Sequence, residues 1–248
     1  MLEQIQKIIV EAGNLAYSLQ ENFTKETKKD GSLVTSADIA VSSFLEKELS
    51  KFYPVLSEEN YSPDLVSLPK VFVVDPIDGT ISYSKKQDSW AILVALVENG
   101  ITTMSFIYQP SKKKMFYAQK GHGSFLQDEN GNVFKLKTNN KLNKLVLSPN
   151  SKKEIESKKL IEKITNIEET TYQFGAGLKM MKIAQGESDM YVSLDKKCGV
   201  WDILAPKLVL EEAGGFLHFE PNYSMDLKKP HVNSCFVATG KATKNPLE

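Results

Sequence analysis

The sequence predicts a mixed protein of helices and sheets, with an α+β N-terminal half and an α/β C-terminal half. Three observations lead to this prediction. Apolar residues recur at helical spacing in residues 2–22 and again from residue 36 onward. Two β-rich runs meet at Asn99-Gly100, a dipeptide typical of two-residue hairpin turns. In the second half, strand-like runs alternate with helical ones, which is the pattern of α/β units.

The N-terminal half should begin with a pair of helices. Residues 2–22 place their apolar side chains on one helix face, and a polar, lysine-rich loop follows. We expect the second helix to begin at Thr35 or Ser36, because a hydroxyl residue is a favoured N-cap, and Asp38 would lie in its first turn.

An antiparallel sheet is expected next. "KVFVVDP" is a buried-strand pattern that we expect Pro76 to end. The hairpin at Asn99-Gly100 follows, and two further β-rich runs lie around Asn130-Gly131. The first half is therefore predicted to be a helix pair on an antiparallel sheet.

A polar, turn-rich stretch at residues 137–150 is the expected domain boundary, giving domains 1–142 and 143–248. In the second domain, "KLVLSPN" begins a strand and a charged helix follows it. The glycine-bounded stretch "GAGLKMMKIAQGESDMYVSL" predicts a helix that leads into a strand. Another helix should start near Trp201 and stop at Gly214-Gly215, before a further strand.

Composition excludes several classes of protein. The 248 residues have zero net charge, so no global field favours nucleic acid or an anionic membrane as a partner. All basic residues are lysines, and the chain therefore has no arginine fork for binding phosphate. Any phosphate must be bound by metal ions, backbone N–H groups or lysine.

The expected location is cytoplasmic. Cys198 and Cys235 form neither a metal-ligand spacing nor a disulfide framework. The N-terminal stretch carries Glu3 and Glu11 and lacks the basic start and apolar run of a signal peptide. No stretch approaches the roughly 18 apolar residues of a membrane span. We expect a monomer or homodimer.

The stretch "VVDPIDGT" at residues 73–80 is the strongest chemical signal. Asp75 directly follows an apolar strand, where an unpaired carboxylate is costly to bury. Pro76 stiffens the turn, so Asp75, Asp78 and the Ile77 carbonyl could direct oxygens at one point. Such hard oxygen ligands suit Mg²⁺. The N–H groups of Gly79 and Thr80 could bind a phosphate oxygen.

Other acidic residues lie at the ends of predicted elements, and each also has an ordinary structural explanation. Asp38 could simply complement a helix dipole, and Glu58-Glu59 could lie in a solvated loop. Asp202 could be a first-turn helix acid.

Four separated motifs, "VTSAD", "SEEN", "DPIDGT" and "VWDILAPKLVLEEAGG", together resemble the inositol monophosphatase superfamily over nearly the whole chain. Members are Mg²⁺-dependent, lithium-sensitive phosphatases. The resemblance implies their layered αβαβα sandwich and two or three bound Mg²⁺ ions. It also implies that the metal ligands are Glu58, Asp75, Asp78, Asp202 and the Ile77 carbonyl.

The resemblance further implies catalytic roles. Thr80 and Asp38 correspond to a threonine–aspartate pair that orients and helps deprotonate the attacking water, with Glu58 holding the metal that activates it. Gly79 and Thr80 correspond to the phosphate cradle. A cluster of Mg²⁺ ions can neutralise the phosphate and stabilise the departing alkoxide.

Substrate-selecting segments resemble the 3'(2'),5'-bisphosphate nucleotidases of this superfamily. "LSEE" and "GAGLK", which contains Gly177 and Lys179, are similar to segments of those enzymes. Lys179 at a glycine-rich helix start could meet a second phosphate, and the alternative is that it is an exposed helix lysine. The expected substrate is adenosine 3',5'-bisphosphate, which would be hydrolysed to AMP and phosphate.

Two features favour an inositol monophosphatase or a broader sugar phosphatase instead. "DGTIS" is closer to the sequence that follows this motif in inositol monophosphatases, and Asp195 lies where those enzymes contact substrate hydroxyls. A catalytically idle binding partner is a third alternative, and it would be expected to lack a ligand or the Thr80–Asp38 pair.

Overall fold

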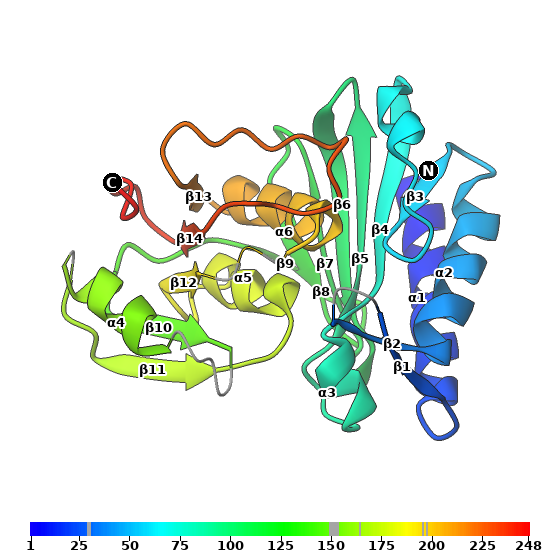
Figure 1. Ribbon diagram of the computed structural model, residues 1–248, viewed down its shortest axis with the longest axis horizontal. Coiled ribbons are helices and arrows are strands. Elements are labelled where there is room, and N and C mark those ends of the chain that lie inside the picture. The colour runs from blue at the N-terminus through cyan, green and yellow to red at the C-terminus, as the bar shows by residue number, and fades with distance from the viewer. Residues whose placement is uncertain (29–30, 149–153, 164, 195, 197) are drawn as a thin grey trace.

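The computed structural model describes residues 1–28, 31–148, 154–163, 165–194, 196 and 198–248. Five layers follow one another across the molecule (Figure 1), in the αβαβα order that the resemblance implies. Between the outer layers and the central one lie a seven-stranded and a five-stranded sheet. The helices are α1 (Leu2–Leu19) and α2 (Ser36–Leu49) in the first layer, α5 (Ala176–Ala184) and α6 (Val200–Glu212) in the middle, and α4 (Glu154–Glu162) in the last.

The seven-stranded sheet is formed by consecutive strands in the order β3 to β9. Only the β3–β4 pair is parallel, and every other neighbouring pair is antiparallel, so the predicted antiparallel sheet is largely confirmed. Its strands are β3 (Val55–Ser57), β4 (Lys70–Asp78), β5 (Ala91–Glu98), β6 (Ile101–Gln109), β7 (Lys114–Gln119), β8 (Ser124–Gln127) and β9 (Val133–Lys135).

Two details of this sheet differ from the prediction. Strand β4 does not end at Pro76 but continues to Asp78, because the register shifts between Asp75 and Asp78. This irregularity accommodates Pro76, which has no backbone N–H to donate to the neighbouring strand. The stretch around Asn130-Gly131 forms three strands rather than two, since a second turn near Gly121 separates β7 from β8.

The five-stranded sheet combines both kinds of pairing, in the order β11-β10-β12-β14-β13. Strand β10 is parallel to β11 and β12, as expected of α/β units, and β14 runs antiparallel to both β12 and β13. The strands are β10 (Lys144–Leu147), β11 (Glu169–Tyr172), β12 (Met190–Ser193), β13 (Phe216–Phe219) and β14 (Phe236–Thr239).

Small elements gather at the edge where β4 ends. The hairpin of β1 (Lys25–Thr27) and β2 (Leu33–Thr35) lies beside α3 (Thr80–Ser84) (Figure 1). Two short 3₁₀ turns, Pro63–Ser67 and Pro110–Lys112, complete the described elements.

Helix α6 packs against both sheets, and the three elements share one hydrophobic core. Nine of its thirteen residues are buried, as expected of a helix that packs against neighbours on most of its circumference. Side chains such as Ile203 pack in one cluster with Leu93 of the first sheet and Phe236 of the second. The chain thus passes from the seven-stranded sheet to the five-stranded sheet between residues 135 and 144, while one hydrophobic core includes residues of both sheets. Among the described residues, no helix has the length and hydropathy needed to cross a bilayer.

The α1–sheet interface predicts a destabilising effect for Gly13→Ala. A Cβ at this buried position would lie 2.5 Å from the Tyr108 ring and 2.9 Å from Pro110. Overpacking of this kind costs about 1–3 kcal/mol, more than the roughly 1 kcal/mol that alanine gains in helix propensity. Urea denaturation should show a lower free energy of unfolding. The exposed Asn14→Ala on the same helix should not lower it, and an unchanged or raised value for Gly13→Ala would contradict the packing.

Candidate metal centre and active site

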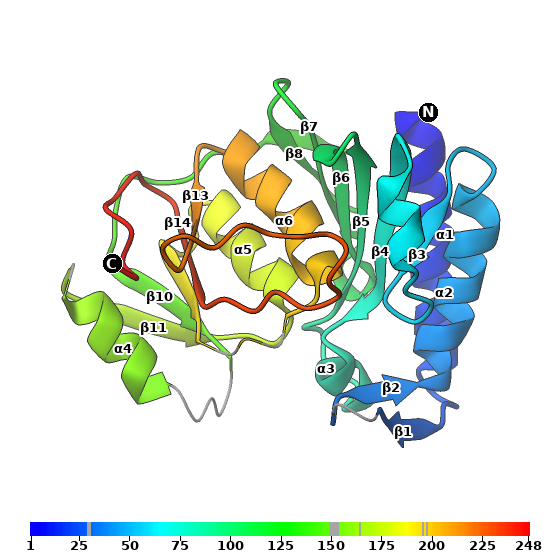
Figure 2. The ribbon, with the colours of Figure 1, turned by 45° about the horizontal axis from the view of Figure 1, so that its top comes forward.

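The predicted acidic motifs meet at one cavity of about 620 Å³, at the end of β4. Helices α5 and α6 each direct one end toward this point (Figure 2). The cavity is lined by the predicted residues Glu58, Asp75, Ile77, Asp78, Gly79, Thr80, Lys179 and Asp202. Segments from both halves of the chain therefore build the site.

Three aspartates form its centre. One carboxylate oxygen from each of Asp75, Asp78 and Asp202 lies within 4.8 Å of the others. Asp75 and Asp78 are buried, whereas Asp202 is partly exposed to the cavity. Close oxygens of this kind are the donor set of a hard divalent cation such as Mg²⁺, and they fit the predicted metal site.

Asp78 caps the N-terminus of α5. Its Oδ1 accepts the N–H of Ala176 at 3.1 Å, and its Oδ2 accepts the N–H of Gly177 at 2.8 Å. A Cβ at Gly175 or Gly177 would lie 2.9 Å from Asp78 Oδ2, so both glycines are required for this approach. Gly177, a residue of the segment predicted to bind substrate, directs its N–H at Asp78 and is not among the residues lining the cavity.

Backbone N–H groups also bind the other two carboxylates. Asp75 Oδ1 accepts the N–H of Ile77 at 2.9 Å, which folds the Asp-Pro-Ile turn back on itself. Asp202 Oδ2 accepts the N–H of Gly199 at 2.7 Å, in the first turn of α6. Each aspartate of the cluster is thus oriented by a backbone donor before any cation binds.

Burial raises the pKa of every member of the cluster. It raises the pKa of Asp78 to about 7, and the negative charge of Asp202 adds to this rise. The pKa of Asp75 lies well above its ordinary value because of burial and the charge of Glu58. Burial also raises the pKa of Asp202. A divalent cation would favour the charged forms, since it supplies the opposite charge at this point.

Lys28 of the β1–β2 hairpin bridges the glutamate pair. Its Nζ lies 2.9 Å from Glu58 Oε1 and 2.9 Å from Glu59 Oε1. Burial, with the charge of Asp202, raises the pKa of Glu58 to about 8. The sequence signalled only a lysine-rich loop here, and nothing in it indicated that this hairpin reaches the site.

Asp38 and Thr80 are brought together as predicted. Thr80 Oγ1 lies 3.3 Å from Asp38 Oδ1 and 3.2 Å from the Ile77 carbonyl oxygen. The Thr35 N–H donates to Asp38 Oδ2 at 2.8 Å and the Asp38 N–H donates to Thr35 Oγ1 at 3.4 Å, which forms the capping box of α2. The Thr35 hydroxyl also donates to Asp38 Oδ2, at 2.5 Å. Burial raises the pKa of Asp38 to about 6.

Gly79 adopts a positive φ of 94° directly before α3, and a Cβ there would lie 2.7 Å from the Ser89 carbonyl oxygen. Only glycine fits this turn without strain. The remaining predicted residue, Asp195, lies outside the described residues.

Lys179 is buried, with 3% of its surface exposed, and is not an exposed helix residue. Its Nζ donates to Ser148 Oγ at 2.8 Å and lies 4.6 Å from the Tyr191 ring centroid. Its charge acts on Asp78 and Asp202, whose pKa values it lowers against the larger effect of burial. Sequence reasoning missed several other residues that line the cavity: Tyr61, Ser148, Phe174, Tyr191, Trp201 and His231.

Metal-free protein should lose stability as the pH rises from about 5 to about 8. The folded-state pKa values of Asp78, about 7, and Glu58, about 8, lie above the unfolded values near 4. Within this window the folded state binds more protons than the unfolded state, so linkage lowers the free energy of unfolding with rising pH. Urea denaturation with a chelator checks this, and a stability that increases over the same range would contradict it.

Asp75→Asn should stabilise the chelated protein at about pH 8 and remove its stabilisation by Mg²⁺. The amide oxygen can still accept the Ile77 N–H, while the cost of burying a carboxyl that is ionised in the unfolded chain at this pH is removed. We expect a gain of about 1 kcal/mol or more, the value of one pKa unit. Thermal unfolding with and without Mg²⁺ measures both effects. The exposed Asp64→Asn serves as the control, and a Mg²⁺ response equal to that of the wild type in Asp75→Asn would exclude this metal site.

Comparisons with known proteins identify the family of this chain. The model of the inositol monophosphatase family matches residues 1–243. The chain is 29% identical to the 3'(2'),5'-bisphosphate nucleotidase CysQ of Aggregatibacter actinomycetemcomitans, over 96% of this chain and 91% of that protein. It is also 29% identical to the histidinol-phosphatase of Mycobacterium tuberculosis, over 87% and 83%.

A solved structure of an IMPase/NADP phosphatase complexed with Mg²⁺ and phosphate superposes with a TM-score of 0.79 at 22% identity, covering 97% of this chain and 92% of that one. At this identity the likeness establishes the fold. The family match and the similarity to named phosphatases show more than the fold. This chain belongs to the inositol monophosphatase family and is a phosphatase.

Proposed function

We propose that the protein is a Mg²⁺-dependent 3'(2'),5'-bisphosphate nucleotidase that hydrolyses adenosine 3',5'-bisphosphate to AMP and phosphate. Two or three Mg²⁺ ions and lithium sensitivity are part of this proposal. The similarity to the CysQ nucleotidase over 96% of the chain supports it.

The buried Lys179 is the observation that carries the substrate assignment. Lys179 is 3% exposed, and its ammonium donates to Ser148 Oγ and acts on the charges of Asp78 and Asp202. Lys179 lines the cavity beside the aspartate cluster, where it adds a fixed positive charge to the site of an anionic ligand. A second phosphate on the substrate suits this charge better than a neutral polyol does, and the chain has no arginine to serve instead.

The residues proposed to bind Mg²⁺ are Glu58, Asp75, Asp78, Asp202 and the Ile77 carbonyl. When bound, Mg²⁺ supplies positive charge to the phosphate and the leaving oxygen and lowers the pKa of a coordinated water. Asp75, Asp78 and Asp202 are held in place by backbone N–H groups, so they need little rearrangement to bind a cation.

Thr80 and Asp38 are proposed to handle the proton of the attacking water. Thr80 Oγ1 can accept a hydrogen bond from that water while donating to Asp38 Oδ1 at 3.3 Å. A proton passing from water to Thr80 Oγ1 is matched by one passing from Thr80 to Asp38. The raised pKa of Asp38, about 6, makes its carboxylate a stronger base than an exposed aspartate. The Gly79 and Thr80 N–H groups are proposed to bind phosphate oxygens.

Hydrolysis of inositol phosphates or other sugar phosphates is the second candidate. It is favoured by Ile81-Ser82-Tyr83 after the phosphate cradle, the segment that is more similar to inositol monophosphatases. Both candidates use the same metal ligands, so only the choice of substrate separates them.

Wild-type protein should release phosphate from adenosine 3',5'-bisphosphate with a kcat/KM at least about tenfold higher than from inositol 1-phosphate. Lys179→Gln should reduce this ratio by about 10- to 100-fold, because a charged hydrogen bond contributes roughly 1.5–3 kcal/mol. Asp78→Asn should abolish the hydrolysis of both esters. A wild-type preference for inositol 1-phosphate would reject the nucleotidase assignment in favour of the second candidate.

A further inference from the structure

The mouth of the cavity carries an apolar surface that the phosphatase chemistry does not use. Phe174, in the loop between β11 and α5, lines the cavity and is half-buried. Ile81 of α3 also lines it, and 49% of the Ile81 surface is exposed. A metal cluster and a phosphate need polar contacts, so these two side chains suit another part of the ligand.

Lys85 extends this surface along α3. Residues 81 and 85 are four apart, which places Ile81 and Lys85 on the same side of the helix end. Lys85 Nζ lies 5.6 Å from the centroid of the Phe174 ring, within the range of a cation–π contact. Lys85 is exposed on a flexible stem, so an incoming group can displace its ammonium from the ring at little cost.

The two sides of this surface are held close to the phosphate cradle. A Cβ at Gly79 would lie 3.5 Å from the backbone nitrogen of Gly175, so the start of α3 and the loop before α5 nearly touch. Phe174 directly precedes Gly175 in the chain. Phe174 is thus next in the chain to a residue beside the phosphate cradle, and it lines the same cavity as Gly79 and Thr80.

Three other aromatic side chains of the cavity, Trp201, Tyr61 and His231, contact one another. Trp201 packs at 6.0 Å from Tyr61 and at 6.3 Å from His231, in tilted and edge-to-face arrangements. The Tyr61 hydroxyl donates to the Leu227 carbonyl. Phe174 differs from these three rings in that the exposed side chain of Lys85 lies over it.

We propose that Phe174, bordered by Ile81 and Lys85, is a stacking platform for the nucleobase and selects nucleotides over non-aromatic phosphate esters. The flat π-face of a base stacks on an aromatic side chain without needing specific hydrogen bonds. This inference rests on the proposed nucleotidase function and assigns the part of the substrate that the metal centre and Lys179 leave unbound.

The test compares two ligands that differ in the base. The dissociation constants of AMP and ribose 5-phosphate are measured by isothermal titration calorimetry, with Mg²⁺ present, on wild-type protein and on variants. AMP should bind the wild type at least about fivefold more tightly than ribose 5-phosphate, the lower end of what one stacked base contributes. Phe174→Ala should remove this difference, and Phe174→Trp should retain it.

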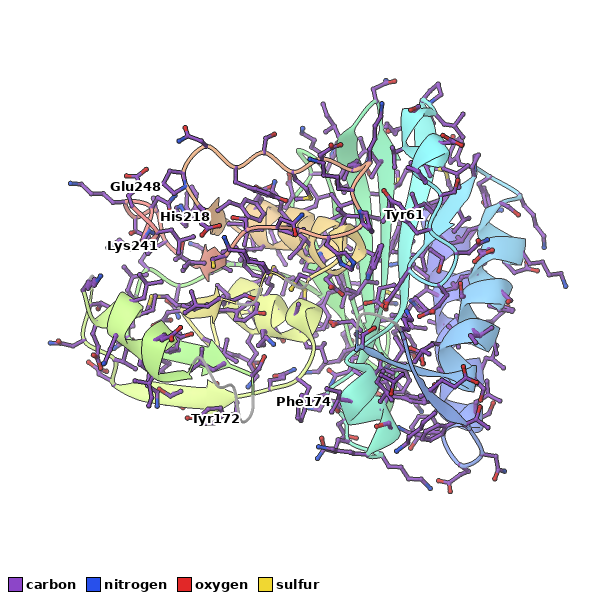
Figure 3. All side chains as sticks on the ribbon, in the orientation of Figure 1. Tyr61, Tyr172, Phe174, His218, Lys241 and Glu248 are labelled. Atoms are coloured by element: carbon purple, nitrogen blue, oxygen red, sulfur yellow. The ribbon has the colours of Figure 1, made fainter. Side chains whose placement is uncertain are left out.

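Tyr172→Ala is the matched control. Tyr172 is an exposed aromatic residue two positions upstream, and it lies farther from α3 than Phe174 does (Figure 3). It is not among the cavity-lining residues, so its substitution should leave the AMP-to-ribose-phosphate ratio unchanged.

Because the readout is binding, it separates this proposal from the proposed activity. Equal affinity of the wild type for the two ligands, binding of neither, or an undiminished ratio in folded Phe174→Ala would overturn the platform. A wild type that binds AMP through Phe174 but does not hydrolyse adenosine 3',5'-bisphosphate would retain the platform and reject the nucleotidase assignment.

Discussion

Mutual repulsion among buried carboxylates is the constraint that the rest of this structure serves. One carboxylate oxygen from each of Asp75, Asp78 and Asp202 lies within 4.8 Å of the others, and burial is the largest cause of the raised pKa of each. Such a cluster is tolerable because backbone N–H groups bind each carboxylate, among them donors at the N-termini of α5 and α6. The remaining negative charge is what a divalent cation would neutralise. The fold therefore assembles a cation site at some cost to its own stability.

The layered architecture brings these distant segments together. Strand β4 carries two of the aspartates to the edge of the first sheet, and the middle helix layer directs its N-termini at that edge (Figure 2). Because the core around α6 contacts both sheets, movement of one sheet against the other would disturb the site. Close backbone approaches at Gly79, Gly175 and Gly177 complete the arrangement, since a Cβ at any of them would come within 3 Å of a neighbouring oxygen. Packing of the core thus also fixes the positions of the site residues.

Much of this was predictable, because its signals are local. The helix at Ser36, the hairpin at Asn99-Gly100 and the aspartates after a buried strand follow from periodicity, turn chemistry and the cost of burial. The resemblance then placed Asp202 with Asp75, which spacing alone could not do. Three features escaped prediction because they depend on contacts between distant segments: the bulge that carries β4 past Pro76, the reach of Lys28 to Glu58 and Glu59, and the capping of α5 by Asp78.

The most direct test of the central claim is to titrate Mg²⁺ into chelator-treated protein by calorimetry at about pH 7, in two buffers of different ionisation enthalpy. The difference in apparent heat counts the protons released. Since burial holds protons on the metal-free cluster, with the pKa of Asp78 near 7, saturable binding should release protons. Proton release should disappear together with binding in Asp78→Asn. Saturable binding without proton release, or no binding at all, would contradict the account.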